Sequence, residues 1–256
     1  MTTRNDAILS DYRPNESVAD GVTMERRTML RLSAGTIAAA LTATACRSTP
    51  DARVQAQVEP HSAELLEIGE FMAQWSPRAR AFIDGGGEEE EAYLMGLSEF
   101  VSSLREPTDS EMRKVLTDIM NEHGGDRSAV PFVLVMLRLD PGKGFGHHDH
   151  RDYNGVIRGV EGEVRIRNYD ILGDELVPPK GRTFQVQETR HERVLPGSLS
   201  TLGLRRDNVH DLVAGPEGAR VLDAFTFLKR GARSHFMEVD ATPRDAENNI
   251  YDAAWV

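Results

Sequence analysis

The sequence of 256 residues has a single cysteine, Cys46. One cysteine excludes a framework of disulfides within the chain, and it excludes a zinc or iron–sulfur site built from cysteine thiolates. An excess of positive charge is also missing, because the formal net charge is -11. A general nucleic-acid binder presents a basic surface to phosphate, so that class is not expected. Hydrophobic residues make up 39% and charged residues 28%, which is typical of a soluble globular protein.

Long hydrophobic runs are lacking as well. The apolar stretch from Leu32 to Ala45 is too short to span a bilayer comfortably. Arg26-Arg27, followed by Met29-Leu30-Arg31, precedes this stretch. The arrangement resembles a twin-arginine translocation signal, with Met29 and Arg31 at the usual positions of phenylalanine and lysine. Residues 1–45 are therefore expected to be an export signal read by the twin-arginine translocon.

The end of this signal is open to two interpretations. Ala43-Thr44-Ala45 fits a small-residue cleavage site, which would release a periplasmic protein. Cys46 follows directly, and a cysteine in that position is also the lipid-bearing first residue of lipoproteins, which would tether the protein to a membrane. Met24 is a second candidate start, because the residues before it add nothing to the signal.

Three regions are expected after the signal. Residues 46–60 are polar with two prolines and are predicted to be a linker. Residues 61–126 are predicted to be helical: apolar positions over 62–83 follow a helical period, and Thr108-Asp109-Ser110-Glu111 fits a capping box for a helix ending near His123. Residues 127–256 instead contain short strand-like runs separated by Gly and Pro turns, and they are predicted to form a β-barrel with a C-terminal tail. We see no internal repeat.

These strand-like runs recur about every ten residues. They cover residues 131–137, 153–157, 163–169, 183–186, 199–202, 210–213 and 221–228. Many short strands at such spacing indicate a β-sandwich or a small barrel, so the fold is expected to be mainly β.

The stretch from Pro141 to His150 carries the chemistry. Side chains two apart on a strand share a face, so His148 and His150 can point into the barrel while His147 and Asp149 point away. Two imidazoles on one face can ligate one metal ion. His147 is expected to face outward or to cap a turn.

The surrounding spacing resembles the first cupin motif. Its residues in order are Gly142, His148, His150, Gly155 and Gly162, with Gly155 at the position of the usual glutamate ligand. Pro196-Gly197 and Asn208-Val209-His210 resemble the second motif, which supplies a third ligand, His210. The resemblance implies a cupin double-stranded β-helix barrel with an N-terminal helical cap, and a metal on three histidines.

A cupin without the glutamate is similar to the thiol dioxygenases, the group of cysteine dioxygenase, cysteamine dioxygenase and plant cysteine oxidases. Residues 164–170, 208–210 and 221–223 also follow the pattern of that group. The resemblance covers roughly residues 130–230. It implies a non-haem Fe(II) enzyme that adds both atoms of O2 to a small thiol, such as cysteine, cysteamine or a mercapto-acid, and yields a sulfinate.

Other residues are assigned by this resemblance or by proximity. Asp223 is expected to support the centre or position the substrate, with a structural pairing to an arginine as the other interpretation. Tyr153 is a candidate to offer its hydroxyl to a substrate, or else packs in the barrel. A cysteine–tyrosine crosslink of the kind found in mammalian cysteine dioxygenase is excluded by Gly155. Arg138, Arg158 and Arg205 are candidates for binding a substrate carboxylate.

The relay residues of that enzyme are also replaced, because Val221, Asp223 and Phe225 stand at their positions. The choice of thiol therefore stays open. The alternative function is a metal-binding cupin of the cell envelope without redox chemistry, serving as an isomerase, a hydrolase or a metabolite-binding protein. A zinc ion on three histidines with an open position would activate water in such a protein.

Overall fold

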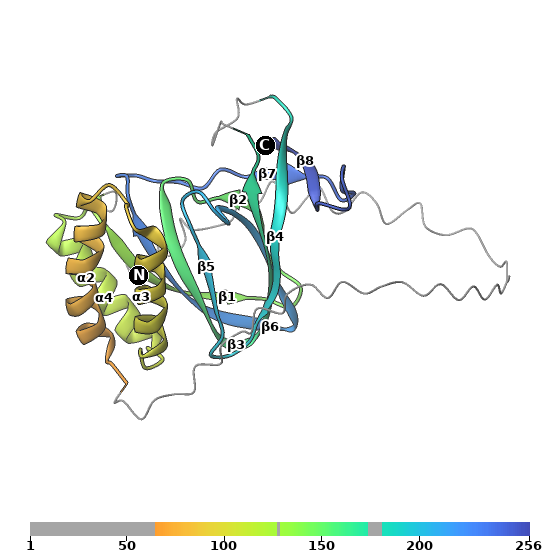
Figure 1. Cartoon of the computed structure of the whole chain (residues 1–256). Helices are drawn as coiled ribbons and strands as arrows, with labels where there is room; N and C mark the ends of the chain where they lie inside the picture. Colours follow the sequence, from red (N-terminus) through yellow and green to blue (C-terminus); the bar gives the residue numbers. More distant parts are fainter. Residues whose placement is uncertain (1–64, 127–128, 174–180) are drawn as a thin grey trace, which may run out of the picture. The chain divides into compact units, whose positions relative to one another are not determined.

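The structure is a computed structural model that describes residues 65–126, 129–173 and 181–256. The expected signal at 1–45 and linker at 46–60 lie outside these residues. Three helices are described: α2 (Ile68–Asp84), α3 (Glu90–Ser102) and α4 (Asp109–Glu122). They lie together on one side of a curled antiparallel sheet (Figure 1). None of the described helices is both long and apolar enough to cross a membrane.

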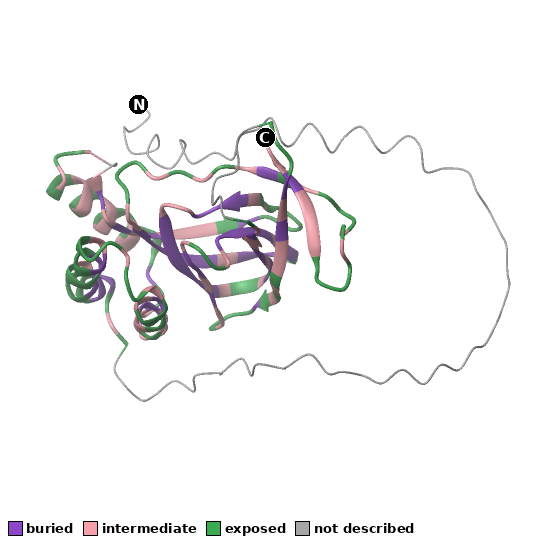
Figure 2. Cartoon of the chain, turned by 45° about the horizontal axis from the view of Figure 1, so that its top comes forward, coloured by how far each residue is buried: buried purple, intermediate pink, exposed green. Residues whose placement is uncertain are grey.

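The helices form where local signals and apolar periodicity agree. The capping box predicted at Thr108 is present, because the Thr108 and Glu111 side chains each accept from the other's backbone N–H. A second capping box joins Glu67 and Glu70 at the start of α2. Helices α2 and α3 each bury one face and leave the other to water, as the purple and green sides in Figure 2 show, whereas α4 has no fully buried residue.

Eight strands build the sheet. They are β1 (Phe132–Leu139), β2 (Gly144–Asp149), β3 (Tyr153–Ile171), β4 (Phe184–Val194), β5 (Leu199–Leu202), β6 (Val209–Phe227), β7 (Met237–Val239) and β8 (Ile250–Trp255). Their order is β1-β6-β3-β4-β8-β7, with β2 paired to β6 and β5 paired to β3. β3 and β6 are each 19 residues long and pair along nearly their whole length.

Both long strands bend at glycines. The two halves of each strand therefore belong to different parts of the curled sheet. Gly162 and Gly218 have φ values of 68° and 78°, a region open to glycine and strained for other residues. A Cβ on Gly162 would lie 2.2 Å from the carbonyl oxygen of Gly218, so a side chain would not fit. The register of β3 against β6 shifts beside Gly162. Before the bend β3 pairs with β5, and after it β3 pairs with β4.

Alternation along β6 separates two apolar cores. Leu222 and Ala224 face the helices, where they join a cluster with Phe71 and Trp75 of α2. Val221 faces the interior of the barrel, where it packs in a cluster with Ile157, Ile166 and Leu212. The interior face of the same strands is the one that carries the candidate site.

The predicted mainly β fold with N-terminal helices is confirmed. Four predicted short strands merge in pairs into β3 and β6, because the glycines between them bend the chain without ending the pairing. The expected C-terminal tail contains two further strands, β7 and β8, and β8 extends the sheet beside β4.

Candidate metal centre

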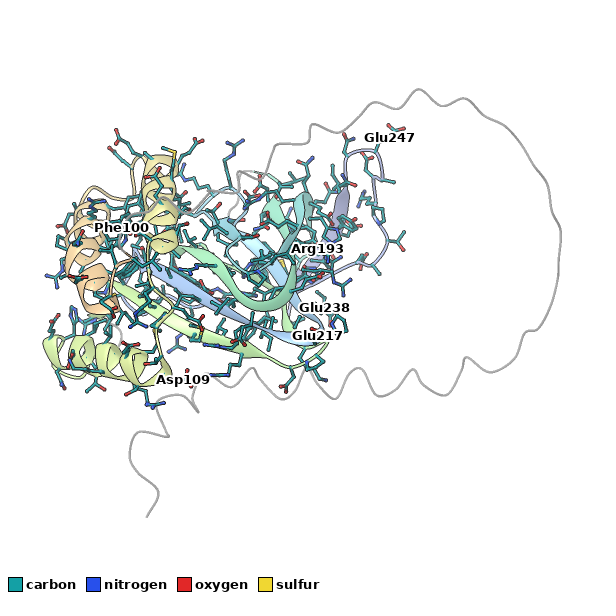
Figure 3. The ribbon with its side chains drawn as sticks, turned by 90° about the horizontal axis from the view of Figure 1, so that it is seen from below. Phe100, Asp109, Arg193, Glu217, Glu238 and Glu247 are labelled. Atoms are coloured by element: carbon teal, nitrogen blue, oxygen red, sulfur yellow. The ribbon has the colours of Figure 1, made fainter. Side chains whose placement is uncertain are left out.

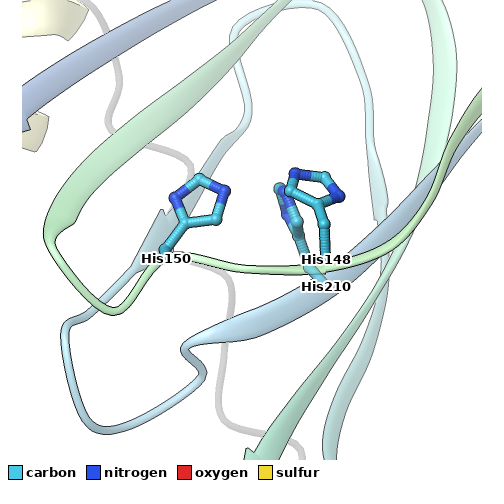
Figure 4. A group of neighbouring side chains, drawn as sticks. All are labelled: His148, His150 and His210. Carbon is cyan, nitrogen blue, oxygen red and sulfur yellow. The ribbon is translucent and has the colours of Figure 1, made fainter. Parts of the chain in front are cut away.

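Three histidines from two neighbouring strands come together in the barrel interior. His148 of β2 and His210 of β6 are direct partners in the antiparallel register, so their side chains project to one face. His150 follows directly after the end of β2. Figure 4 shows the three rings rising from these strands toward one another. One ligand nitrogen from each residue lies within 4.8 Å of the others, and all three residues are buried. This group is the one such cluster among the residues that the structure describes.

The hydrogen bonds around the rings suit metal ligands. His148 Nδ1–H donates to the carbonyl oxygen of Gly146 at 2.8 Å, which leaves its Nε2 lone pair free. That Nε2 lies 3.0 Å from Nε2 of His210. Both ring nitrogens of His150 and Nδ1 of His210 are buried without a hydrogen-bond partner. Buried polar atoms are normally paired, so unpaired imidazole nitrogens in a cluster fit a bound metal ion.

Burial keeps these imidazoles neutral. It lowers the pKa of His148, and it lowers the pKa values of His150 and His210 well below the usual 6.5. The neighbouring histidines depress the pKa values of His150 and His210 further, since two positive rings would repel. Neutral imidazole is the form that donates a lone pair to a metal. The site is therefore prepared at neutral pH to bind a cation.

An aromatic wall lines the centre. The Tyr153 ring centroid is 4.1 Å from that of His150, and the Phe225 centroid is 6.0 Å away. Phe236 packs on His148 with a centroid distance of 5.4 Å. The Tyr153 hydroxyl makes a short hydrogen bond with the Ser234 hydroxyl. Tyr153 thus packs in the barrel beside a predicted ligand, and its proposed contact with a substrate stays a prediction.

Asp223 lies in the barrel interior on the same face of β6 as Val221 and Phe225. It is 3% exposed, and its Oδ1 has no hydrogen-bond partner. Burial raises the pKa of this carboxyl well above the usual 3.8. The structure shows no arginine paired with it among the described residues, so the structural pairing weighed from the sequence is not found. A role toward a substrate stays a prediction.

Asp149, between His148 and His150, connects the site to a later segment of the chain. Its side chain is fully buried and pairs with Arg151. The backbone N–H of His235 donates to its Oδ1 at 2.7 Å, and the His235 ring lies 3.2 Å from the same oxygen. His148 forms an isolated bridge to Phe236 in that segment. The Asp149 contacts therefore hold the end of β2, and with it two of the three histidines, in place.

His147 does not face outward as expected. Its ring packs against Tyr169, with Nε2 3.4 Å from the tyrosine hydroxyl, and its side chain is 17% exposed. Burial lowers the pKa of His147. It does point away from the three histidines, toward the second face of β3 and β6, where Tyr169 and Val209 belong to a third apolar cluster. That face is covered by β7 and β8, which the sequence did not predict.

The three candidate arginines do not reach the site. Arg138 pairs with Asp109 at the start of α4, which Figure 3 labels. Arg158 donates to the carbonyl oxygens of Val101 and Leu104 beneath the helices. Arg205 lies exposed in the turn before β6.

Two inward residues that sequence reasoning missed are Asn168 of β3 and Arg190 of β4. Asn168 is the register partner of His210, and Arg190 is the register partner of Asn168. They therefore share the face of the three histidines. Asn168 lies in the stretch 164–170 that follows the thiol dioxygenase pattern, but nothing in the sequence assigned it a role, and Arg190 belongs to no motif. The strand register is what places both residues beside the histidines.

No protein-family model matches the sequence, and no curated protein sequence matches it. Some solved structures are similar over part of the chain. An oxalate oxidase is 16% identical with a TM-score of 0.31, over 41% of this chain and 46% of its own. A recombinant pro-11S globulin of pumpkin is 14% identical with a TM-score of 0.32, over 42% and 23%.

KdgF from a Halomonas species is 18% identical with a TM-score of 0.27, over 38% of this chain and 69% of its own. The matched region covers less than half of the oxalate oxidase's own length. The mainly β fold follows from the strand order and register described above, and these partial similarities say nothing about a reaction.

Proposed function

We propose that the protein is a non-haem iron(II) thiol dioxygenase. It would add both atoms of O2 to the sulfur of a small thiol, so that R–SH and O2 give the sulfinic acid R–SO2H with no further reductant. Cysteine, cysteamine and mercapto-acids are the candidate substrates. The observation that carries the proposal is the ligand set: three buried neutral imidazoles gather in one group, and no carboxylate joins them.

The residues present fit an iron ion. His148, His150 and His210 would hold it, since imidazole suits ferrous iron and one nitrogen of each buried ring lies within 4.8 Å of the others. When bound, the ion supplies the redox chemistry with O2 and leaves open coordination positions. Three neutral ligands leave its double positive charge uncompensated, which favours an anionic thiolate as the next partner.

The surrounding residues would protect and fix this centre. Tyr153, Phe225 and Phe236 present aromatic faces to the histidines and limit the access of water. Asp149, through its contacts with Arg151 and His235, holds the strand end that carries His148 and His150. Rigid support of this kind keeps ligand nitrogens in position.

Export remains part of the proposal. Residues 1–45 would direct the folded, metal-loaded protein through the twin-arginine translocon, and Cys46 would be either free or lipidated. Fractionation of cells, with mass spectrometry of the mature N-terminus, distinguishes a periplasmic protein from a lipid-anchored one. Retention of an uncleaved chain in the cytoplasm would contradict export.

The reaction is tested by oxygen uptake of the iron(II)-loaded protein with cysteine, cysteamine and 3-mercaptopropionate. We expect uptake with at least one thiol and a product heavier by two oxygen atoms. His148→Ala should abolish uptake, whereas His191→Ala, on β4 with a side chain 56% exposed, is the matched control and should not. No uptake with any thiol would refute the proposal. Zinc in the purified protein, with hydrolase or isomerase activity, would favour the alternative of a non-redox cupin.

A further inference from the structure

The inner face of the sheet carries a row of polar side chains beside the centre. Across β2, β6, β3 and β4, direct register partners follow one another in the order His148, His210, Asn168 and Arg190. Directly opposed residues of antiparallel strands project to the same face, with Cβ atoms about 4.5–5.5 Å apart. Asn168 is thus the neighbour of His210 on the side away from His148.

Asn168 is buried without any hydrogen-bond partner for its side chain. Its exposed fraction is 0%, and both Oδ1 and Nδ2 are unpaired. Its backbone carbonyl oxygen, by contrast, accepts from the Thr189 hydroxyl at 3.1 Å. A buried amide with an unmet donor and acceptor is costly, and such groups call for an explanation. An apolar residue of the same size would avoid this cost.

His210, beside Asn168, has a ring nitrogen that lacks a hydrogen-bond acceptor. His148 Nδ1–H is held by the carbonyl oxygen of Gly146, which fixes Nε2 as the free nitrogen. Nδ1 of His210 is buried and has no acceptor. Metal-bound histidines almost always donate the second ring N–H to an acceptor, which fixes the tautomer and the ring orientation.

Arg190 cannot meet this need, since a guanidinium carries donors only. Its Nη2 is already 3.0 Å from Asp207 Oδ2. Asn168 carries an acceptor and is the nearest polar register partner of His210 on the side of β3.

We propose that Asn168 is the positioning residue for His210. In the metal-loaded protein its Oδ1 accepts from His210 Nδ1–H and so presents Nε2 of His210 to the metal. This inference rests on the metal centre of the proposed function, but it does not depend on the reaction with thiols.

The test compares two substitutions in the full chain that keep the number and branching of side-chain heavy atoms. Asn168→Asp keeps an acceptor at the Oδ1 position, whereas Asn168→Leu removes it and also removes the unpaired polar atoms. We expect Asn168→Leu to weaken binding of cobalt(II) or zinc(II), measured by competition with a chelating dye, by about 10- to 100-fold. Asn168→Asp should bind within about threefold of the unchanged protein, since its acceptor rescues the contact. The metal-free Asn168→Leu protein should melt no lower than the unchanged protein, which separates positioning from a merely structural role.

Asn154→Ala is the matched control. Asn154 is also on β3 and fully buried, but it faces the helices, where its Nδ2 donates to Glu90 at 2.9 Å. This change should lower the melting temperature and leave metal affinity unchanged. Nitrogen-15 NMR of histidine in the zinc-loaded protein gives a direct readout. His210 Nδ1 should carry a hydrogen-bonded proton with Asn or Asp at 168, and this signature should be lost in Asn168→Leu.

The outcomes separate the two proposals. Unchanged metal affinity and an unchanged His210 spectrum in Asn168→Leu would overturn the positioning role. A raised KM for a thiol with normal metal affinity would also overturn it, because Asn168 would then contact the substrate. Failure of the unchanged protein to bind cobalt or zinc would overturn it too. If metal binding depends on Asn168 but no thiol drives oxygen uptake, the inference stands and the proposed reaction falls.

Discussion

Glu90 at the start of α3 joins the helices to the barrel through one oxygen atom. Its Oε1 accepts from Asn154 Nδ2 at 2.9 Å and from the backbone N–H of Leu204 at 2.8 Å. Glu90→Ala leaves both donors unmet, at about 1–2 kcal/mol each. It also removes a negative charge from a helix N-terminus, worth about 0.3–1 kcal/mol. We therefore expect Glu90→Ala to lower the free energy of unfolding by about 2–5 kcal/mol.

Glu90→Gln should behave differently, because its amide oxygen can accept both hydrogen bonds while the buried charge is gone. Burial raises the pKa of Glu90 above its usual 4.5. A raised folded-state pKa means that protonation favours the folded state. The resulting stability is fully present below the pKa of the unfolded chain and is lost as the pH rises through the folded pKa. Relative to the unchanged protein, Glu90→Gln should thus gain stability as the pH rises from the usual carboxyl pKa of 4.5 through the raised pKa of the folded state.

Urea unfolding of both variants, followed by circular dichroism across this pH range, measures these differences. Glu88→Gln, two residues before the helix at an exposed position, is the control and should be neutral. If Glu90→Gln destabilises as much as Glu90→Ala, or if its stability relative to the unchanged protein falls as the pH rises, the explanation from burial and shared hydrogen bonds is wrong.

Four further outcomes are expected. Asp149→Ala should lower the free energy of unfolding by about 3–5 kcal/mol, because it leaves the charge of Arg151 unpaired in a largely buried position. The affinity for metal, measured by dye competition, should also fall. An unchanged affinity would contradict the role of Asp149 in holding the histidines in place. Gly162→Ala should lower the melting temperature, because a Cβ would meet the Gly218 carbonyl oxygen at 2.2 Å in a left-handed conformation; a neutral result in a thermal melt would refute the bend as a constraint. Phe71→Ala, in the core between helices and sheet, should cost about 3–5 kcal/mol in urea unfolding. Adding zinc at 100 times its dissociation constant should stabilise the protein by about 2.7 kcal/mol, seen as a higher melting temperature that a chelator reverses.

The parts of the fold that were predictable from the sequence depend on local pattern. The capping box at Thr108 and the strand Leu199–Leu202 were found because capping and strand signals act over a few neighbouring residues. His148, His150 and His210 were singled out because motif spacing and strand alternation placed them together. The merging of strands at Gly162 was missed, since a glycine that bends a continuous strand resembles one that ends it.

What was missed depends on contacts between distant parts of the chain. His147 was expected to be exposed because the sequence does not show that Tyr169 and the strands β7 and β8 cover it. Asn168 lies in a stretch that follows the family pattern, but it was not singled out, because its position opposite His210 depends on the strand register. Arg158 is close to the motif in sequence, but its side chain lies on the face of the sheet that packs against the helices. Register and sheet face decide these cases, and neither is visible in one sequence.

The separation of the ligands along the chain has a consequence for assembly. His148 and His150 are near neighbours in sequence, but His210 lies 62 residues beyond His148. An unfolded chain therefore offers a metal only the local pair, and the third nitrogen arrives after β3 to β6 have paired. Such long-range pairing is slow because a large loop must close first. A bound metal would consequently stabilise the completed fold. It would contribute little to the early stages of folding and would mainly slow unfolding.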